Sequence, residues 1–125
     1  MKIAVDFDGT IVSDSYPKIG KTRLFAFDVL LRLQAEGHQL LLWTVRDGIQ
    51  LEEAVAFCKK NGLVFYAVNK NFPEEESLTT ASRKLNADIF IDDKNIGGIL
   101  PWGEVYQQLG NEKTSLLKQK KSWWF

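Results

Sequence analysis

The chain has 125 residues, of which 45% are hydrophobic and 26% are charged. This balance is typical of one globular domain with its own core. Sixteen basic residues match sixteen acidic ones, so no net charge favours binding to nucleic acid or an anionic membrane. The single cysteine, Cys58, excludes a disulfide within the chain, and we expect a cytoplasmic protein. With no signal peptide and no apolar run of sufficient length, we expect no membrane span.

Strand-like and helix-like segments alternate along the chain. Short apolar runs predict four strands, at Lys2–Phe7, Gln39–Thr44, Leu63–Val68 and Ala87–Asp92. Apolar residues at helical spacing, with glycine or proline at the ends, predict helices at Lys21–Glu36, Gln50–Asn61, Ser77–Lys84 and from Pro101 towards Leu109. Short connections between such elements predict a doubly wound, Rossmann-like α/β domain with a mostly parallel sheet and helices on both faces.

Two segments lie outside this alternation. The breakers between Gly9 and Gly20 predict a loop or small hairpin. Residues 1–110 form the predicted core domain, and 111–125 form a tail in which lysines precede Trp123-Trp124-Phe125. Such a tail can touch a membrane interface or a nucleic-acid strand. We favour docking of the tail on the domain or on a partner subunit, as in a homo-oligomer, because tryptophans are enriched in interfaces.

Paired carboxylates follow two of the predicted strands. Asp6 and Asp8 end the first strand at i, i+2 spacing, which aims both side chains to the same side. Asp92 and Asp93 end the fourth strand. The first pair alone could be a polar turn that ends the strand. If the two strands are neighbours, up to four acidic oxygens meet at one sheet edge, where ligands of such folds bind, and this donor set suits Mg²⁺.

Four segments, in order, resemble the motifs of the haloacid dehalogenase superfamily of phosphohydrolases. They are Asp6-x-Asp8-Gly9-Thr10, the run Leu-Leu-Leu-Trp-Thr44, Lys84, and Ile91-Asp92-Asp93. The resemblance implies a Mg²⁺-dependent phosphatase that hydrolyses a phosphomonoester through an aspartyl-phosphate. Asp6 would be the nucleophile, and Asp8 would protonate the leaving group and then deprotonate water. An aspartate at this second position resembles the phosphatase branch of the superfamily.

The resemblance also implies roles for other residues. Thr44 would donate its hydroxyl to a phosphoryl oxygen, and Lys84, with Lys70 as the alternative, would neutralise charge there. The metal ligands would be Asp6, the main-chain carbonyl of Asp8, and Asp92 and Asp93, one of these two directly and the other directly or through water. We expect substrate contacts at Gly9, Thr10, Thr44 and Arg46. From its position, Arg46 is either a clamp for a second anionic group or a surface arginine.

The connections leave no room for a cap domain, so we expect an open site for a small or large phosphorylated substrate. Specificity would then come from Asp14, Tyr16 and Lys18, and from Asn69–Glu76. The alternatives are a phosphotransferase or phosphomutase on the same scaffold and a phosphate-binding protein without turnover. A receiver domain also pairs acidic residues with Mg²⁺, but its phosphorylated aspartate ends a middle strand, whereas Asp6 ends the first.

Overall fold

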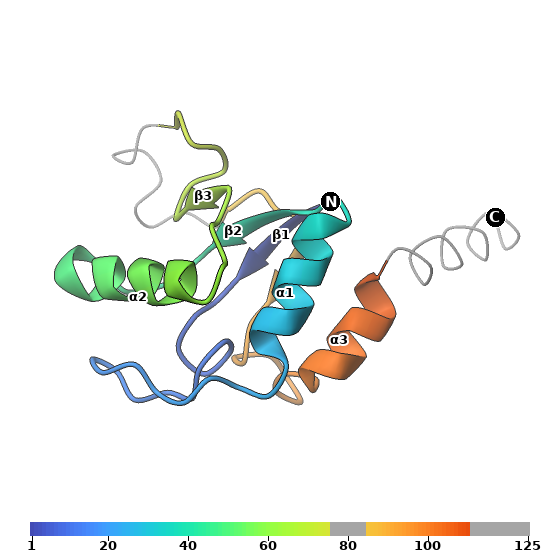
Figure 1. Cartoon of the computed structure of the whole chain (residues 1–125), viewed down its shortest axis with the longest axis horizontal. Helices are drawn as coiled ribbons and strands as arrows, with labels where there is room; N and C mark the ends of the chain where they lie inside the picture. The colour runs from blue at the N-terminus through green and yellow to red at the C-terminus, as the bar shows by residue number, and fades with distance from the viewer. Residues whose placement is uncertain (76–84, 111–125) are drawn as a thin grey trace, which may run out of the picture.

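The computed structural model describes residues 1–75 and 85–110, and these form a parallel sheet with helices packed on it (Figure 1). The strand order is β3-β2-β1-β4, and the strands are β1 Lys2–Val5, β2 Gln39–Leu42, β3 Ala67–Val68 and β4 Ile89–Ile91. The helices are α1 Ala26–Ala35, α2 Gly48–Lys60 and α3 Trp102–Leu109. The predicted α/β class and parallel sheet are confirmed. The helix predicted at Ser77–Lys84 and the tail at 111–125 lie outside the described residues.

The register of the sheet aligns the ends of its central strands. Val5 pairs with Leu42 of β2 and with Ile91 of β4. The N–H of Asp6 donates to the carbonyl of Ile91 at 3.0 Å, so pairing with β4 continues one residue beyond β1. Asp6 therefore lies beside the residues that follow β4, although more than eighty residues separate them in the chain.

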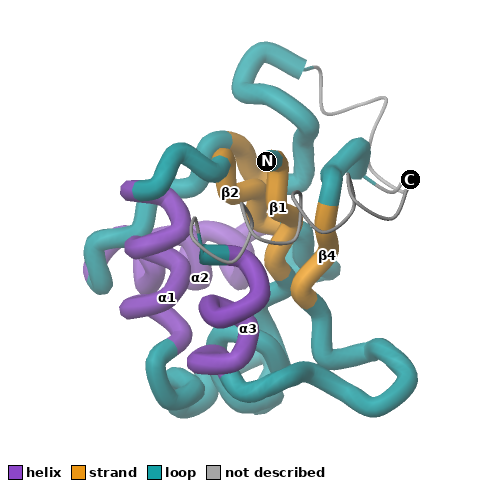
Figure 2. Tube along the Cα trace, turned by 90° about the vertical axis from the view of Figure 1, so that its right-hand side faces the viewer, coloured by secondary structure: helices purple, strands orange, loops and turns teal. Residues whose placement is uncertain are grey.

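The three described helices lie together on one side of the strands (Figure 2). Their buried side chains, including Leu30 of α1, Cys58 of α2 and Val105 of α3, form one core with Val5 and Leu42. Right-handed crossovers explain the placement of α1 and α2, because the chain moves in one direction from β1 through β2 to β3. Helix α3 follows β4 and packs against α1 on the same face.

The second face of the sheet has a smaller apolar cluster. Its buried members are Ala4, Leu41, Ala67 and Leu85, and the rings of Trp43 and Phe90 pack beside them with centroids 5.0 Å apart. Helices on both faces were expected, and the described residues place helices on the first face alone.

The segment between β1 and α1 forms a hairpin, here called the flap (residues 11–23). Its two sides are joined by hydrogen bonds from Ser13 N–H to the carbonyl of Lys21, and from Arg23 N–H to that of Ile11, both at 2.8 Å. The loop or small hairpin predicted here is confirmed. This pairing also delays α1, which begins at Ala26 rather than at Lys21. In the described ranges, no helix is long and apolar enough to span a bilayer.

Candidate active site

Three carboxylates meet beyond the ends of β1 and β4. Asp6, Asp92 and Asp93 each place one oxygen within 4.8 Å of the others. The chain leaves β1 towards β2 and later returns to β4 on the other side of β1. The carboxylates therefore occupy the switch point at which open parallel sheets bind ligands. We call Asp6, Asp92 and Asp93 the carboxylate cluster.

The carboxylate cluster has more negative charge than its described surroundings neutralise. Burial, with smaller contributions from Asp92 and Asp93, raises the pKa of Asp6 to about 7, against the opposing effect of the Phe7 main-chain N–H. The ion pair that the described residues form with the cluster is from Lys94 Nζ to Asp93 Oδ2, at 3.9 Å, and the Lys94 side chain is 76% exposed. A proton or a cation bound among these oxygens would relieve the repulsion.

Thr10 contacts two members of the carboxylate cluster, Asp6 and Asp93. Its side chain is buried, and its hydroxyl lies 3.2 Å from Asp93 Oδ1 and 3.5 Å from Asp6 Oδ2, so it can donate to either. The same hydroxyl accepts a hydrogen bond from the N–H of Asp93 at 3.1 Å. The indole N–H of Trp102 donates to the Thr10 carbonyl at 3.0 Å, which fixes this turn against α3.

Gly9 lets the turn approach Asp93 closely. Its φ is +85°, and a Cβ at this position would collide with the Asp93 carboxylate. Only glycine adopts this conformation without strain and leaves room for that side chain. Gly9 and Thr10 were predicted to contact substrate, and the structure shows them shaping the cluster.

The side chain of Asp8 does not join the carboxylate cluster. Its two oxygens accept hydrogen bonds from Arg46 instead, from Nε at 2.7 Å and from Nη2 at 2.8 Å. Three of the four acidic side chains expected at this sheet edge therefore lie close together, and that of Asp8 does not. The physical reason is that β1 ends at Val5, so the alternation of a strand no longer applies when the chain reaches Asp8. Metal binding through the main-chain carbonyl of Asp8 stays a prediction.

Arg46 is buried rather than exposed. Only 1% of its surface is accessible, so the alternative of a surface arginine is wrong. Sequence reasoning missed its partnership with Asp8, because the two residues are 38 positions apart and no local spacing connects them. It also missed the bond between Trp102 and Thr10, for the same reason.

Thr44 lies beyond the end of β2, next to β1. Its N–H donates to Asn69 Oδ1 at 2.8 Å, and its hydroxyl oxygen accepts from the N–H of Arg46 at 3.1 Å. Because the Thr44 hydroxyl is the acceptor in the contact with Arg46, its own proton can be donated to another group. Lys70 follows Asn69 at the end of β3. Lys84 lies outside the described residues, so the choice between the two lysines stays as the sequence left it.

A comparison with solved structures places the chain in a family. It is 52% identical to a conserved protein coded by a locus of Bacteroides thetaiotaomicron, with a TM-score of 0.82 over 90% of this chain and 92% of that one. The chain belongs to the family of that conserved Bacteroides protein. Comparisons with protein-family models and with curated proteins gave no match.

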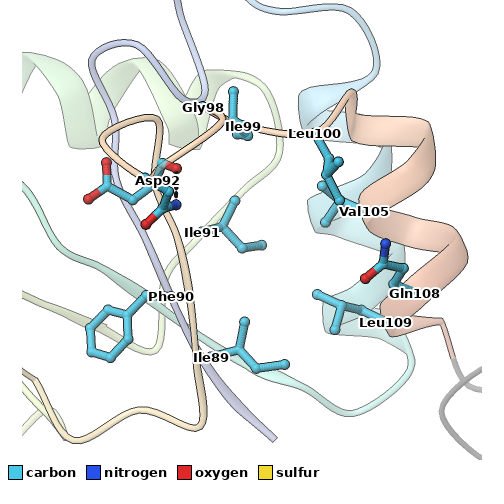
Figure 3. A pocket seen from close by; sticks show the side chains of 11 residues that line it. Ile89, Phe90, Ile91, Asp92, Gly98, Ile99, Leu100, Val105, Gln108 and Leu109 are labelled. Carbon is cyan, nitrogen blue, oxygen red and sulfur yellow. Dashed lines mark hydrogen bonds between the residues drawn. The ribbon is translucent and has the colours of Figure 1, made fainter. Parts of the chain in front are cut away.

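A cavity of about 250 Å³ opens between β4 and α3 and ends at Asp92 (Figure 3). Ile89 and Ile91 point towards Val105 and Leu109 across it, so most of its wall is apolar. At its polar end, Lys94 N–H donates to Asp92 Oδ1 at 3.1 Å. The cavity is thus a neighbour of the carboxylate cluster, and its apolar wall is unsuited to a phosphoryl group.

Proposed function

We propose that this family member is a Mg²⁺-dependent phosphohydrolase of the haloacid dehalogenase type, which hydrolyses a phosphomonoester through an aspartyl-phosphate on Asp6. The observation that carries the proposal is the convergence of Asp6, Asp92 and Asp93 within 4.8 Å at the switch point of the sheet. A half-buried carboxylate beside two others has no structural benefit of its own, because their mutual repulsion raises the energy of the ionised protein.

The residues of the carboxylate cluster fit Mg²⁺. An octahedral ion with oxygens at about 2.1 Å brings its ligands to roughly 3–4 Å from one another, which a small inward movement of the three carboxylates would achieve. Asp92, Asp93 and one oxygen of Asp6 would hold the ion. When bound, Mg²⁺ supplies positive charge that keeps Asp6 ionised and neutralises phosphoryl oxygens.

In the proposed reaction the carboxylate of Asp6 attacks phosphorus, and the bond from phosphorus to the leaving oxygen breaks. Asp8, protonated at the start, gives its proton to the leaving alkoxide. Water then attacks phosphorus, Asp8 takes a proton from that water, and phosphate leaves with Asp6 restored. The hydroxyl of Thr44 would donate to a phosphoryl oxygen. For its role, Asp8 has to release at least one oxygen from Arg46.

An open site agrees with this reading. In the described residues, the turn that follows β1 and the flap fill the segment between β1 and α1, and α2, β3 and their short connections lie between β2 and residue 75. The described part of the chain therefore contains no cap domain. Val45 and Ile96, which follow β2 and β4, are almost fully exposed, and they would meet the leaving group of a substrate at this edge.

The test is a phosphate-release screen over a panel of phosphomonoesters with Mg²⁺. The Asp6→Asn protein serves as the blank, and Asp28→Asn, at an exposed position of α1, is the matched control. We expect release by the wild type and by Asp28→Asn, none by Asp6→Asn, and loss of release in EDTA with recovery in Mg²⁺. Release that is insensitive to EDTA, or equal in the Asp6→Asn protein, would contradict the proposal.

One observation favours a second candidate, a phosphate-binding protein without turnover. Both oxygens of Asp8 are occupied by a buried guanidinium, and a binder would have no use for a free acid. Phosphate binding measured calorimetrically with Mg²⁺, together with no release from any ester, would favour this candidate. A phosphotransferase or phosphomutase would be distinguished by transfer to an added acceptor alcohol or sugar phosphate.

A further inference from the structure

The guanidinium of Arg46 uses every hydrogen-bond donor that it has. Besides the two bonds to Asp8, Nη2 donates to the carbonyl of Lys18 at 2.9 Å. Nη1 donates to the carbonyls of Pro17 at 3.2 Å and Gln50 at 3.3 Å. These are five N–H groups with five acceptors, which is the full capacity of an arginine. The Asp8 hydrogen bonds also raise the pKa of Arg46 above its ordinary value, so it stays charged.

Two aromatic rings complete the surroundings of this cation. The guanidinium carbon lies 5.1 Å from the ring centroid of Phe7 and 5.1 Å from that of Tyr16, within the range of cation–π contact. Phe7 is buried beside β1, whereas Tyr16 is in the exposed part of the flap. The ring contacts therefore join the same two parts of the chain as the hydrogen bonds.

The tip of the flap (residues 16–18) depends on Arg46 for its position. Within the flap, Lys18 N–H bonds the carbonyl of Ser15, and Tyr16 N–H lies 3.4 Å from Asp14 Oδ1. Across the described residues, the hydrogen bonds that the tip makes outside the flap all go to Arg46. One buried side chain thus determines where the flap tip lies and how the Asp8 carboxylate is oriented.

We propose that Arg46 is a positioning residue that fixes the acid–base carboxylate of Asp8 and the flap tip as one unit. The catalytic part of this statement rests on the proposed function, whereas the coupling of Asp8 to the flap does not. Removal of the guanidinium would leave the Asp8 carboxylate and three carbonyls without their donor, and each would then seek water. The flap tip would separate from α2, and Asp8 would lose a single orientation.

The experiment compares Arg46→Met and Arg46→Lys with the wild type. The matched control is Arg32→Met. It removes an exposed arginine of α1 that lies over the ring of Tyr106 in α3. In Arg46→Met we expect hydrogen exchange of the Lys18 and Ser13 amides to rise at least about tenfold and kcat to fall about 100-fold. The Mg²⁺ Kd should stay within about twofold, because the carboxylate cluster makes no contact with Arg46. Arg46→Lys keeps the charge but has fewer donors, so its amide exchange should be slower and its kcat higher than those of Arg46→Met.

A double-mutant comparison shows whether Arg46 acts through Asp8. In an Asp8→Asn background, Arg46→Met should lower kcat by less than about threefold, because the carboxylate that it positions is already gone. An equal loss in both backgrounds, or flap exchange in Arg46→Met and Arg46→Lys that equals the wild type, overturns the inference. Should the wild type release no phosphate at all, the proposed function fails, and flap exchange alone decides the coupling.

Discussion

Asp6 and Asp8 are two positions apart in the chain and occupy opposite electrostatic environments. Asp6 lies among two other carboxylates, and its pKa is raised to about 7. Asp8 is held by a cation that is 1% exposed and bonds both of its oxygens. The first carboxylate lacks a counter-charge in the described structure, and the second has its own within the chain. Short sequence spacing therefore says little about how a carboxylate is neutralised.

This difference suggests a division of labour. A carboxylate with unneutralised neighbours binds a proton or a divalent cation from solution, and it is suited to chemistry. A carboxylate paired with a buried arginine cannot be removed without cost to the fold, because the arginine would be left as a buried, unpaired charge. In the proposed mechanism Asp8 has both tasks, and Arg46 connects them.

The largest expected effect is the loss of phosphate release when Asp6, the proposed nucleophile, is replaced. Asp6→Asn should reduce phosphate release to the level of the reaction without enzyme, because an amide oxygen cannot form the acyl phosphate. The fold should persist, since the change removes one charge from a repulsive cluster. Phosphate release and circular dichroism on the same sample check both statements, and a variant that still turns over would remove the nucleophile assignment.

Asp8→Asn sharpens the comparison kinetically. For an alkyl phosphate, loss of the general acid should lower kcat by about 10²–10⁴-fold. For an aryl phosphate, whose leaving group needs little protonation, the loss in the first step should be much smaller. A pre-steady-state measurement with both substrates checks this, and equal losses would argue that Asp8 does not protonate the leaving group.

The two aspartates should also differ in what their removal does to stability. Asp8→Ala leaves the Arg46 guanidinium buried and unpaired, so the free energy of unfolding should fall by about 3–5 kcal/mol. Asp6→Ala, measured without Mg²⁺, should cause no loss of this size, because it relieves repulsion with Asp92 and Asp93. Urea denaturation at pH 7.5 gives both values. A similar loss in the two variants would contradict this electrostatic difference between Asp6 and Asp8.

The pH dependence of metal binding should report Asp6. Protons and Mg²⁺ compete for the same carboxylate, so a pKa of about 7 predicts a Kd for Mg²⁺ about 100-fold weaker at pH 5 than at pH 8. Without metal, the stability that Asp6 contributes is complete below its ordinary pKa of 3.8. It is lost as pH rises through about 7, because the folded state binds the proton more tightly. Calorimetry and thermal melting, with Asp6→Asn as control, check both.

The smallest expected effect is the weaker Mg²⁺ binding when Thr10, which contacts the carboxylate cluster, is replaced. Thr10→Val keeps the shape of the side chain and removes the hydroxyl that contacts Asp93 and Asp6. Without this orienting contact, Mg²⁺ should bind about 10–100-fold more weakly. Thr22→Val, at an exposed position of the flap, is the control, and calorimetry at pH 8 measures both. Unchanged affinity in Thr10→Val would show that Asp93 is oriented without the hydroxyl.

The sequence by itself determined the alternation of strands and helices, the hairpin between Gly9 and Gly20, and the acidic residues after the first and last strands. These features depend on local periodicity and turn residues, which can be recognised from residues close together in the chain. The ends of the elements depend on more distant contacts. The first helix starts at Ala26 because Thr22 pairs with Val12, a contact that competes with helical spacing and cannot be read from it.

Only the tertiary structure decided which charges meet. The order β3-β2-β1-β4 brings Asp92 and Asp93 to Asp6, and the flap and α2 bring their carbonyls to Arg46. Asp8 joined the second group because β1 had already ended, so its side chain followed the turn rather than the strand. Charge pairing acts through space over a few ångströms, and the chain places such partners side by side only when the whole domain has folded.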